Sequence, residues 1–145
     1  MIHWWFLFRL NAKKLSAAIA EAEGRTSGEI RIFITHKKCA DPMAAAAEQF
    51  DKLGMSATEE RNGVLLFIAP RSRKFAIIGD QGIHQKCGPE FWQQLATAMT
   101  AAFKGGKLTE GLSQAVRQAG ELLAEHFPRK EDDRNELPDD VATDF

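Results

Sequence analysis

Carboxylate and amide side chains flank three apolar runs of this sequence. They are Glu29 before the first run, Glu59 and Asn62 before the second, and Asp80 after the third. Carboxylate and amide oxygens are the ligands that Ca²⁺ and Mg²⁺ prefer. Asp80 lies in the stretch Gly79-Asp80-Gln81-Gly82, whose glycines allow backbone oxygens to approach an ion. The four side chains form a candidate cation site if the fold brings them together. The alternative is that Asp80 only shapes a turn, as Asp beside Gly commonly does.

The three runs have the pattern of β-strands. Residues 29–35 alternate, with isoleucine at every second position, whereas residues 64–69 and 75–78 are apolar throughout. Continuous apolar runs of this length are typical of strands buried on both faces of a sheet. The short polar break at residues 70–74 predicts a β-hairpin between the second and third strands. We expect this hairpin to form the centre of the sheet.

The direction of the strands decides which side chains meet. Asp41 and Pro42 begin a helix between the first two strands, which implies a right-handed crossover and a parallel pair, and the hairpin then reverses the third strand. The starts of the first two strands therefore lie beside the end of the third. We call this end the acidic pole, and it gathers Thr26, Ser27, Glu29, Glu59, Glu60, Asn62, Asp80, Gln81 and His84. The opposite end is the basic pole, with His36, Lys37, Lys38, Asp41, Arg71, Arg73 and Lys74.

Three further helices are predicted to cover this sheet. One runs from the cap Asn11 to Glu23 and ends at a left-handed Gly24, one begins at Gly88-Pro89, and one runs from the cap Thr109 to Pro128. The fold class is therefore α/β: an α/β/α sandwich in which about four helices cover a small mixed sheet. We divide the chain into an apolar N-terminal arm (1–10), an α/β domain (11–128) and a charged tail (129–145), in which Leu137 and Val141 are the apolar anchors.

The composition excludes several function classes. A net charge of −1 gives no general attraction to nucleic acid or to a membrane surface. No run approaches the ~20 apolar residues of a membrane span. Cys39 and Cys87 are expected at opposite poles, too far apart for a disulfide, so we expect free thiols and a cytoplasmic protein.

The apolar N-terminus is open to two interpretations. Its aromatic residues are Trp4, Trp5, Phe6 and Phe8, and no basic segment of the kind that opens a signal peptide precedes them. This favours an arm that packs on the domain, on a second copy in a homodimer or on a partner protein, rather than a targeting segment.

Signals for catalysis are weak. Gly106-Lys107 resembles the end of a phosphate-binding loop, but Leu108 stands where the loop needs a hydroxyl. Sequence patterns of serine hydrolases, dithiol redox enzymes and zinc proteases are absent from the sequence. A transition-metal site made of Asp80, His84 and Cys87 fits no firm spacing rule.

Several separated motifs resemble the TPM domain family, in particular its short bacterial members. The motifs are Thr26-Ser-Gly-Glu-Ile30, Arg61-Asn-Gly-Val-Leu65, Lys74-Phe-Ala-Ile-Ile-Gly-Asp-Gln-Gly-Ile83, Phe91-Trp92, Phe103-Lys-Gly-Gly106, Thr109-Glu-Gly-Leu112 and Asp132-Asp-Arg-Asn-Glu-Leu-Pro-Asp139. The sequence departs from the commoner pattern at His84, where an acidic residue is usual, and at Pro89-Glu90, where an Asp is frequent.

The resemblance implies an α/β/α sandwich, divalent-ion binding in some members and acid phosphatase activity in plant members of the thylakoid lumen. Carried onto this sequence, it adds Asp132 and Asp133 of the tail to Asp80, Glu29, Glu59 and Asn62 as candidate ligands of Ca²⁺ or Mg²⁺. Three functions remain open: a binding module with a divalent cation, a metal-assisted phosphatase, and a protein-interaction scaffold that uses the N-terminal arm. No organic cofactor is expected.

Overall fold

The computed structural model describes residues 10–129 and 141–144. Its α-helices are α2 (Ala12–Glu23), α3 (Pro42–Lys52), α4 (Gln81–Lys86), α5 (Pro89–Gly105) and α6 (Leu108–His126). Its strands are β1 (Glu29–Ile34), β2 (Gly63–Ala69), β3 (Lys74–Gly79) and β4 (Ala142–Thr143), and short 3₁₀ turns lie at Met55–Ala57 and Pro70–Ser72.

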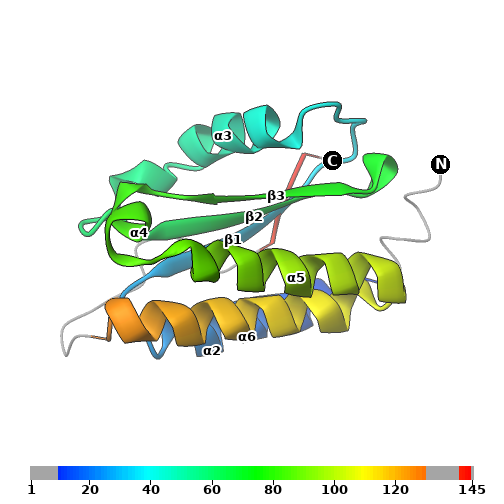
Figure 1. Ribbon diagram of the computed structural model, residues 1–145. Helices are drawn as coiled ribbons and strands as arrows, with labels where there is room; N and C mark the ends of the chain where they lie inside the picture. Colours follow the sequence, from blue (N-terminus) through cyan, green and yellow to red (C-terminus); the bar gives the residue numbers. More distant parts are fainter. Residues whose placement is uncertain (1–9, 130–140, 145) are drawn as a thin grey trace.

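The elements form three layers (Figure 1). A four-stranded sheet with the order β3-β2-β1-β4 has α3 on one face and α2, α5 and α6 on the other. β1 and β2 are parallel, with Glu29 opposite Gly63, and β2 and β3 are antiparallel, with Val64 opposite Gly79. The predicted α/β/α sandwich, its parallel pair and its hairpin are therefore confirmed.

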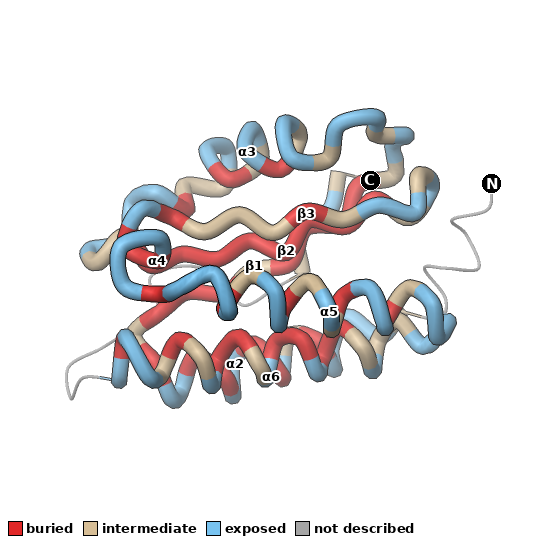
Figure 2. The backbone as a smooth tube through the Cα atoms, viewed as in Figure 1, coloured by how far each residue is buried: buried red, intermediate tan, exposed pale blue. Residues whose placement is uncertain are grey.

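Alternation along the two inner strands builds a core on each face of the sheet. Ile30, Ile32 and Ile34 of β1 face the larger core, beneath α2, α5 and α6. Phe33 of the same strand and Phe67 of β2 face the smaller core beneath α3, where their rings stack with centroids 5.7 Å apart. Every residue of β2 is buried, as Figure 2 shows along the middle of the sheet.

The hairpin is not the centre of the sheet, contrary to the prediction. β2 is an inner strand, but β3 lies at an edge and most of its residues are only partly buried. The apolar run 75–78 indicated burial on both faces; however, α3 and α5 each cover only part of this edge strand. The other edge is β4, a strand that the sequence analysis did not predict, which runs parallel to β1.

Helix ends follow local capping chemistry in some places and tertiary contacts in others. The side chains of Asn11 and Asp41 accept hydrogen bonds from the backbone N–H of Lys14 and Ala44, which confirms both predicted N-caps. Gly24, however, has right-handed backbone angles (φ −66°, ψ −15°). Thr109 does not cap α6, because that helix begins at Leu108 and the Thr109 hydroxyl accepts a hydrogen bond from the backbone N–H of Asn11 instead.

Residues 81–86 form the helix α4, which is absent from the helices predicted from the sequence. The segment is short and rich in glycine and polar residues, so its own pattern gives little helical signal. Asp80 provides the N-cap, and Gly82 and Ile83 are buried against the rest of the fold.

Candidate functional site

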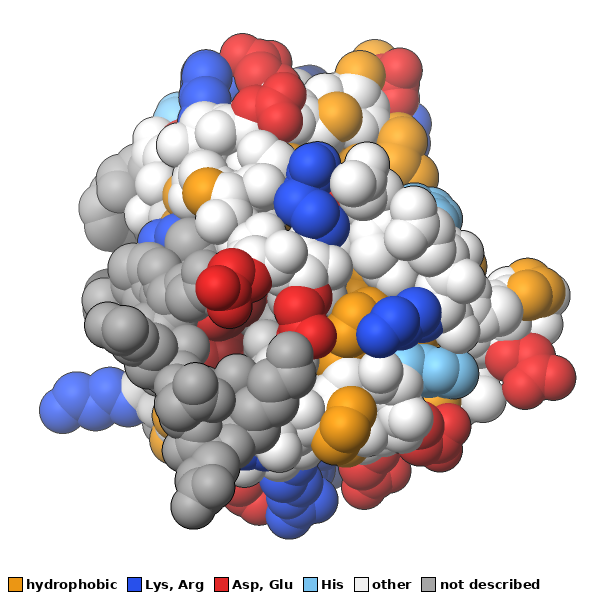
Figure 3. Space-filling model, turned by 90° about the vertical axis from the view of Figure 1, so that its left-hand side faces the viewer, with side chains coloured by type: hydrophobic (Ala, Val, Ile, Leu, Met, Phe, Trp, Pro, Cys, Tyr) orange, Lys and Arg blue, Asp and Glu red, His pale blue; other side chains and the backbone are white. Residues whose placement is uncertain are grey.

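Parallel pairing of β1 and β2 and reversal of β3 bring the predicted acidic pole together. Glu29 begins β1 beside Gly63, and the backbone N–H of Asp80 donates to the carbonyl of Gly63 (2.9 Å). Figure 3 views the molecule from this end, where acidic and basic side chains lie close to one another. The topological prediction on which the candidate site depended is therefore confirmed.

Three polar side chains converge at the start of β2. Ser27 Oγ donates to Glu60 Oε2 (2.5 Å), and Asn62 Nδ2 donates to both Glu60 Oε2 (3.2 Å) and Ser27 Oγ (3.3 Å). Asn62 is only 1% exposed. The backbone N–H of Asn62 is held by Thr58 Oγ1 (3.3 Å). We call this group the Ser27–Glu60–Asn62 cluster.

Glu29 lies directly beside this cluster. Its backbone N–H donates to the carbonyl of Asn62 (3.3 Å), and the residue is 3% exposed. Glu59, by contrast, is exposed. Of two adjacent glutamates, the structure thus directs Glu60 into the cluster and Glu59 toward solvent. Glu60 is at the acidic pole as the strand directions predict, although its position in the sequence does not mark it as a ligand.

Asp80 is held by Arg61 rather than directed at the cluster. Arg61 Nε donates to Asp80 Oδ2 (2.6 Å) and Arg61 Nη2 to Asp80 Oδ1 (2.8 Å), and the backbone N–H of Gln81 also donates to Oδ1 (2.8 Å). The hydrogen bond to Asp80 raises the pKa of Arg61. Both carboxylate oxygens of Asp80 therefore bind the Arg61 guanidinium, and one of them also caps α4. These contacts fit a structural role for Asp80 better than a role as a metal ligand.

Sequence reasoning missed Arg61 as the partner of Asp80, although both residues lie in the motifs quoted above. Arg61 has a left-handed backbone (φ 52°), which is uncommon outside glycine. The guanidinium lies at an end of the sheet that the sequence analysis described as acidic. Its charge offsets that of Asp80 and makes this pole less negative than the residue count suggested.

Gly82 lets the segment 80–82 pack against the backbone of residues 60–61. Its N–H donates to the carbonyl of Arg61 (2.8 Å). A Cβ atom at this position would lie 2.3 Å from the carbonyl oxygen of Glu60 and 2.5 Å from that of Arg61. The second glycine of Gly79-Asp80-Gln81-Gly82 thus serves close backbone packing, which holds residues 60–62 in position.

His84 and Cys87 lie in different surroundings. The rings of His84 and Trp92 are tilted against one another by 31°, with centroids 5.0 Å apart. The buried Cys87 has a raised pKa, first because burial disfavours the thiolate and second because of the negative charge of Glu125. Asp132 and Asp133, like the aromatic residues of the N-terminal arm, lie outside the described residues. Within the described residues, no three His, Cys, Asp or Glu side chains form a group suited to a metal ion.

The sequence and the fold both have relatives among known proteins. The sequence profile of the TPM domain matches residues 6–122. The chain belongs to the TPM domain family. The NMR structure of the BA42 protein from the psychrophilic bacterium Bizionia argentinensis is 36% identical to this TPM domain, with a TM-score of 0.86, and the match covers 92% of this chain and 94% of that one.

A more distant structure shares the fold. The N-terminal domain of the cg2496 protein from Corynebacterium glutamicum is 15% identical, with a TM-score of 0.59, over 75% of this chain and 68% of that one. No protein of curated function matches this TPM domain. The comparisons therefore establish family and fold.

Two further predictions concern the thiols and the membrane. Cys39 and Cys87 are both free, as expected. Cys39 lies near the hairpin turn, where its N–H donates to Ser72 Oγ (2.8 Å), whereas Cys87 follows α4 at the other end of the sheet. In the part of this TPM domain that the structure describes, no helix has the length and apolar character needed to cross a membrane.

Proposed function

We propose that this TPM domain is a binding module that takes one divalent cation, Ca²⁺ or Mg²⁺, at the Ser27–Glu60–Asn62 cluster. The observation that carries the proposal is the convergence of a hydroxyl, a carboxylate and a buried amide within 3.3 Å of one another. All three groups supply hard oxygen ligands, which these ions prefer. Glu29 stands next to the cluster and is the candidate for a second carboxylate.

Binding requires a local rearrangement of the cluster. Asn62 now directs its Nδ2 toward Glu60 and Ser27, so its amide must rotate to present the oxygen to an ion. The ion would replace the hydrogen bonds from Ser27 and Asn62 to Glu60. Because this site offers at most two carboxylates and some rearrangement is needed, we expect weak binding, with a Kd on the order of 10⁻⁴–10⁻³ M.

In this proposal Asp80 is a positioning residue. Its pairing with Arg61 and its cap on α4 hold the backbone of residues 60–62, which carries Glu60 and Asn62. Of the residues predicted from the sequence, Asn62 and Glu29 belong to the proposed site, whereas Asp80 and Glu59 do not. Asp132 and Asp133 remain candidates from the family resemblance alone.

Titration calorimetry with CaCl₂ and with MgCl₂ tests the site. We expect saturable heat for the wild type and a loss of affinity of about tenfold or more for Glu60→Gln, which removes a ligand charge. Glu59→Gln is the matched control: it removes the same charge from the neighbouring position, but Glu59 faces solvent, so the affinity should be unchanged. An affinity that is unchanged in Glu60→Gln would show that the ion binds elsewhere. No saturable heat in the wild type would exclude the proposal.

The same proteins test the phosphatase alternative. A cation at this site could polarise a phosphoryl oxygen and activate water. Hydrolysis of p-nitrophenyl phosphate that needs added Mg²⁺, is lost in Glu60→Gln and persists in Glu59→Gln would make the module an enzyme. Equal turnover in all three proteins would indicate a contaminating phosphatase.

A further inference from the structure

The short strand β4 closes the edge of the sheet beside β1. Phe33 pairs with Ala142 and Ile34 with Thr143, in parallel orientation. Val141 packs on the larger core and Ala142 on the smaller one. Segment 141–144 thus adds to β1 as an extended peptide whose neighbouring side chains enter opposite faces of the sheet, the geometry of strand addition in peptide recognition.

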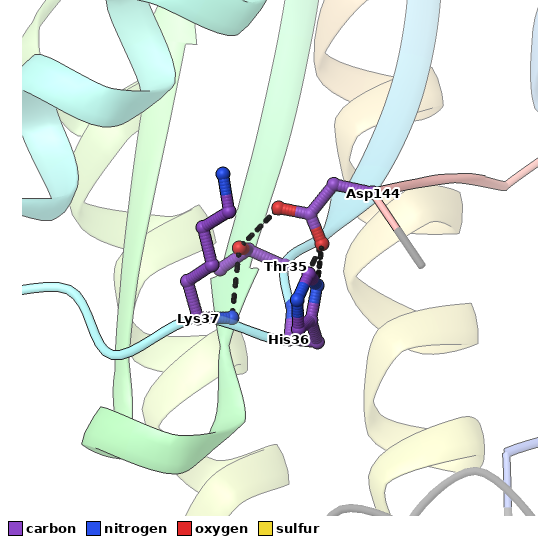
Figure 4. Close-up of polar contacts among 4 residues, drawn as sticks. All are labelled: Thr35, His36, Lys37 and Asp144. Carbon is purple, nitrogen blue, oxygen red and sulfur yellow. Dashed lines mark hydrogen bonds and ion pairs between the residues drawn. The ribbon is translucent and has the colours of Figure 1, made fainter.

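One carboxylate anchors this segment (Figure 4). Asp144 Oδ2 accepts from Thr35 Oγ1 (2.5 Å), and Asp144 Oδ1 accepts from the backbone N–H of His36 (2.8 Å) and contacts His36 Nδ1 (2.7 Å). Thr35 Oγ1 in turn accepts from the backbone N–H of Lys37 (3.1 Å), which directs the hydroxyl proton at Asp144. The Asp144 side chain is 19% exposed.

The groups that hold Asp144 come from consecutive residues at the end of β1. The backbone N–H of Thr35 donates to the carbonyl of Ile68 (3.0 Å), which continues the pairing of β1 with β2 by one residue. This bond fixes the backbone that carries the Thr35 hydroxyl and the neighbouring His36 N–H. The carboxylate-binding group therefore belongs to the body of the domain and needs no contribution from segment 141–144. A different carboxylate in the same register would meet the same donors.

Several cationic side chains lie at the same end of the sheet as this group. Lys37, Lys38, Arg71, Arg73 and Lys74 are exposed at the basic pole. Two contacts join the loop after β1, with Lys37 and Lys38, to the hairpin: Cys39 N–H to Ser72 Oγ (2.8 Å) and Lys74 Nζ to the carbonyl of Ala40 (3.1 Å). Asp41 is exposed nearby, and Lys37 contributes to a lowered pKa of Glu48, after Lys52, so two acids partly offset the field.

We propose that the edge of β1, with Thr35 and His36, is a binding site for an extended acidic peptide of a partner protein, and that segment 141–144 fills it as an intramolecular ligand. The preferred peptide has a small residue, a β-branched residue and an Asp at consecutive positions, as in Ala142-Thr143-Asp144. Its backbone pairs parallel to β1 and its carboxylate binds Thr35 and His36. The site lies at the opposite end of the sheet from the proposed cation site and is independent of it.

A peptide-binding experiment on the full chain tests this proposal. The double variant Ala142→Asp/Asp144→Ala should release the segment, because it places a charge in the smaller core and removes the anchoring carboxylate. A fluorescently labelled peptide of residues 139–145 should bind this variant at least tenfold more tightly than it binds the wild type, as measured by fluorescence anisotropy. The same peptide with Asp144→Ala should not bind.

Equal binding of the peptide to the wild type and the variant, or binding to neither, would overturn the proposal. Circular dichroism and ¹H–¹⁵N NMR spectra establish whether the double variant is folded. Hydrogen exchange of the His36 amide in the wild type gives a second measurement that needs no variant. If segment 141–144 detaches from β1, the His36 amide hydrogen should exchange through local opening, at a rate that depends little on denaturant. Hydrogen exchange only through global unfolding would show that the segment is a permanent part of the fold.

Discussion

Asp80, predicted from the sequence as an ion ligand, instead binds Arg61 and caps α4. Its N-cap bond and its pairing with Arg61 act on the same side chain, which is 6% exposed. Either a guanidinium or a metal ion can neutralise the Asp80 carboxylate, so the residue type alone does not show which of the two it binds.

Two substitutions separate these contacts. Asp80→Ala removes both and should lower the free energy of unfolding by about 1–2 kcal/mol, since loss of an N-cap alone typically costs about 1 kcal/mol. Asp80→Asn keeps a side chain that caps nearly as well and loses only the charge pairing, so it should fall between Asp80→Ala and the wild type. Denaturant unfolding measures both, and an Asp80→Ala protein as stable as the wild type would refute the structural role of this residue.

Gly82 provides a prediction based on atomic contacts. Gly82→Ala forces a Cβ against two backbone carbonyls, which have no freedom to rotate away, and should destabilise the protein by about 2 kcal/mol or more. The matched control is Gly105→Ala at the end of α5, where an added Cβ meets no atom within 4 Å apart from its chain neighbours and the helix's own backbone. There we expect a gain of about 0.5 kcal/mol from the reduced entropy of the unfolded chain. Thermal unfolding of both variants checks the contrast, and equal effects would contradict it.

At the level of elements, the ionised Asp144 side chain adds to the pairing and packing that hold β4 against β1. Burial of Asp144 opposes its ionisation, but hydrogen bonds from Thr35 and His36 outweigh burial, and its pKa is lowered. A carboxyl group with a lowered pKa in the folded state stabilises that state above its ordinary pKa of about 4 and loses this contribution as the pH falls through the lowered value. The contribution of the Asp144 carboxylate to the docking of segment 141–144 should therefore be constant above about pH 5 and be lost in acid.

The ¹H–¹⁵N signal of the His36 amide checks this prediction between pH 7 and pH 2.5. The wild type should show a transition below about pH 4, where Asp144 takes up a proton. Asp144→Asn should lack that transition. The same acid transition in both proteins would assign it to another group.

At the level of the whole molecule, the two thiols report on different parts of the fold. Cys39 is partly exposed near the hairpin turn, whereas Cys87 is buried in the larger core and has a raised pKa. Iodoacetamide at pH 8 should modify Cys39 on the order of tenfold faster than Cys87, because alkylation needs an accessible thiolate. Mass spectrometry of the digested protein measures both rates. In denaturant the rates should converge, and fast modification of Cys87 in the native protein would contradict the packing described.

Both the fold class and the direction of its inner strands follow from local patterns. Isoleucines at alternate positions of residues 29–35 predict one buried face, and Asp41-Pro42 predicts the crossover helix, because side-chain periodicity and capping depend on residues close in sequence. These two inferences were enough to bring Ser27, Glu29 and Asn62 to one end of the sheet.

The partners at each end of the sheet depend on contacts that local patterns do not encode. Asp80 pairs with a residue 19 positions earlier, and Asp144 with residues 108 and 109 positions earlier. Glu59 and Glu60 are chemically alike, and only the path of the backbone sends one to solvent and the other to Asn62. A carboxylate can bind a metal ion, a guanidinium or a set of N–H groups, and the packing of distant segments decides which of these it meets.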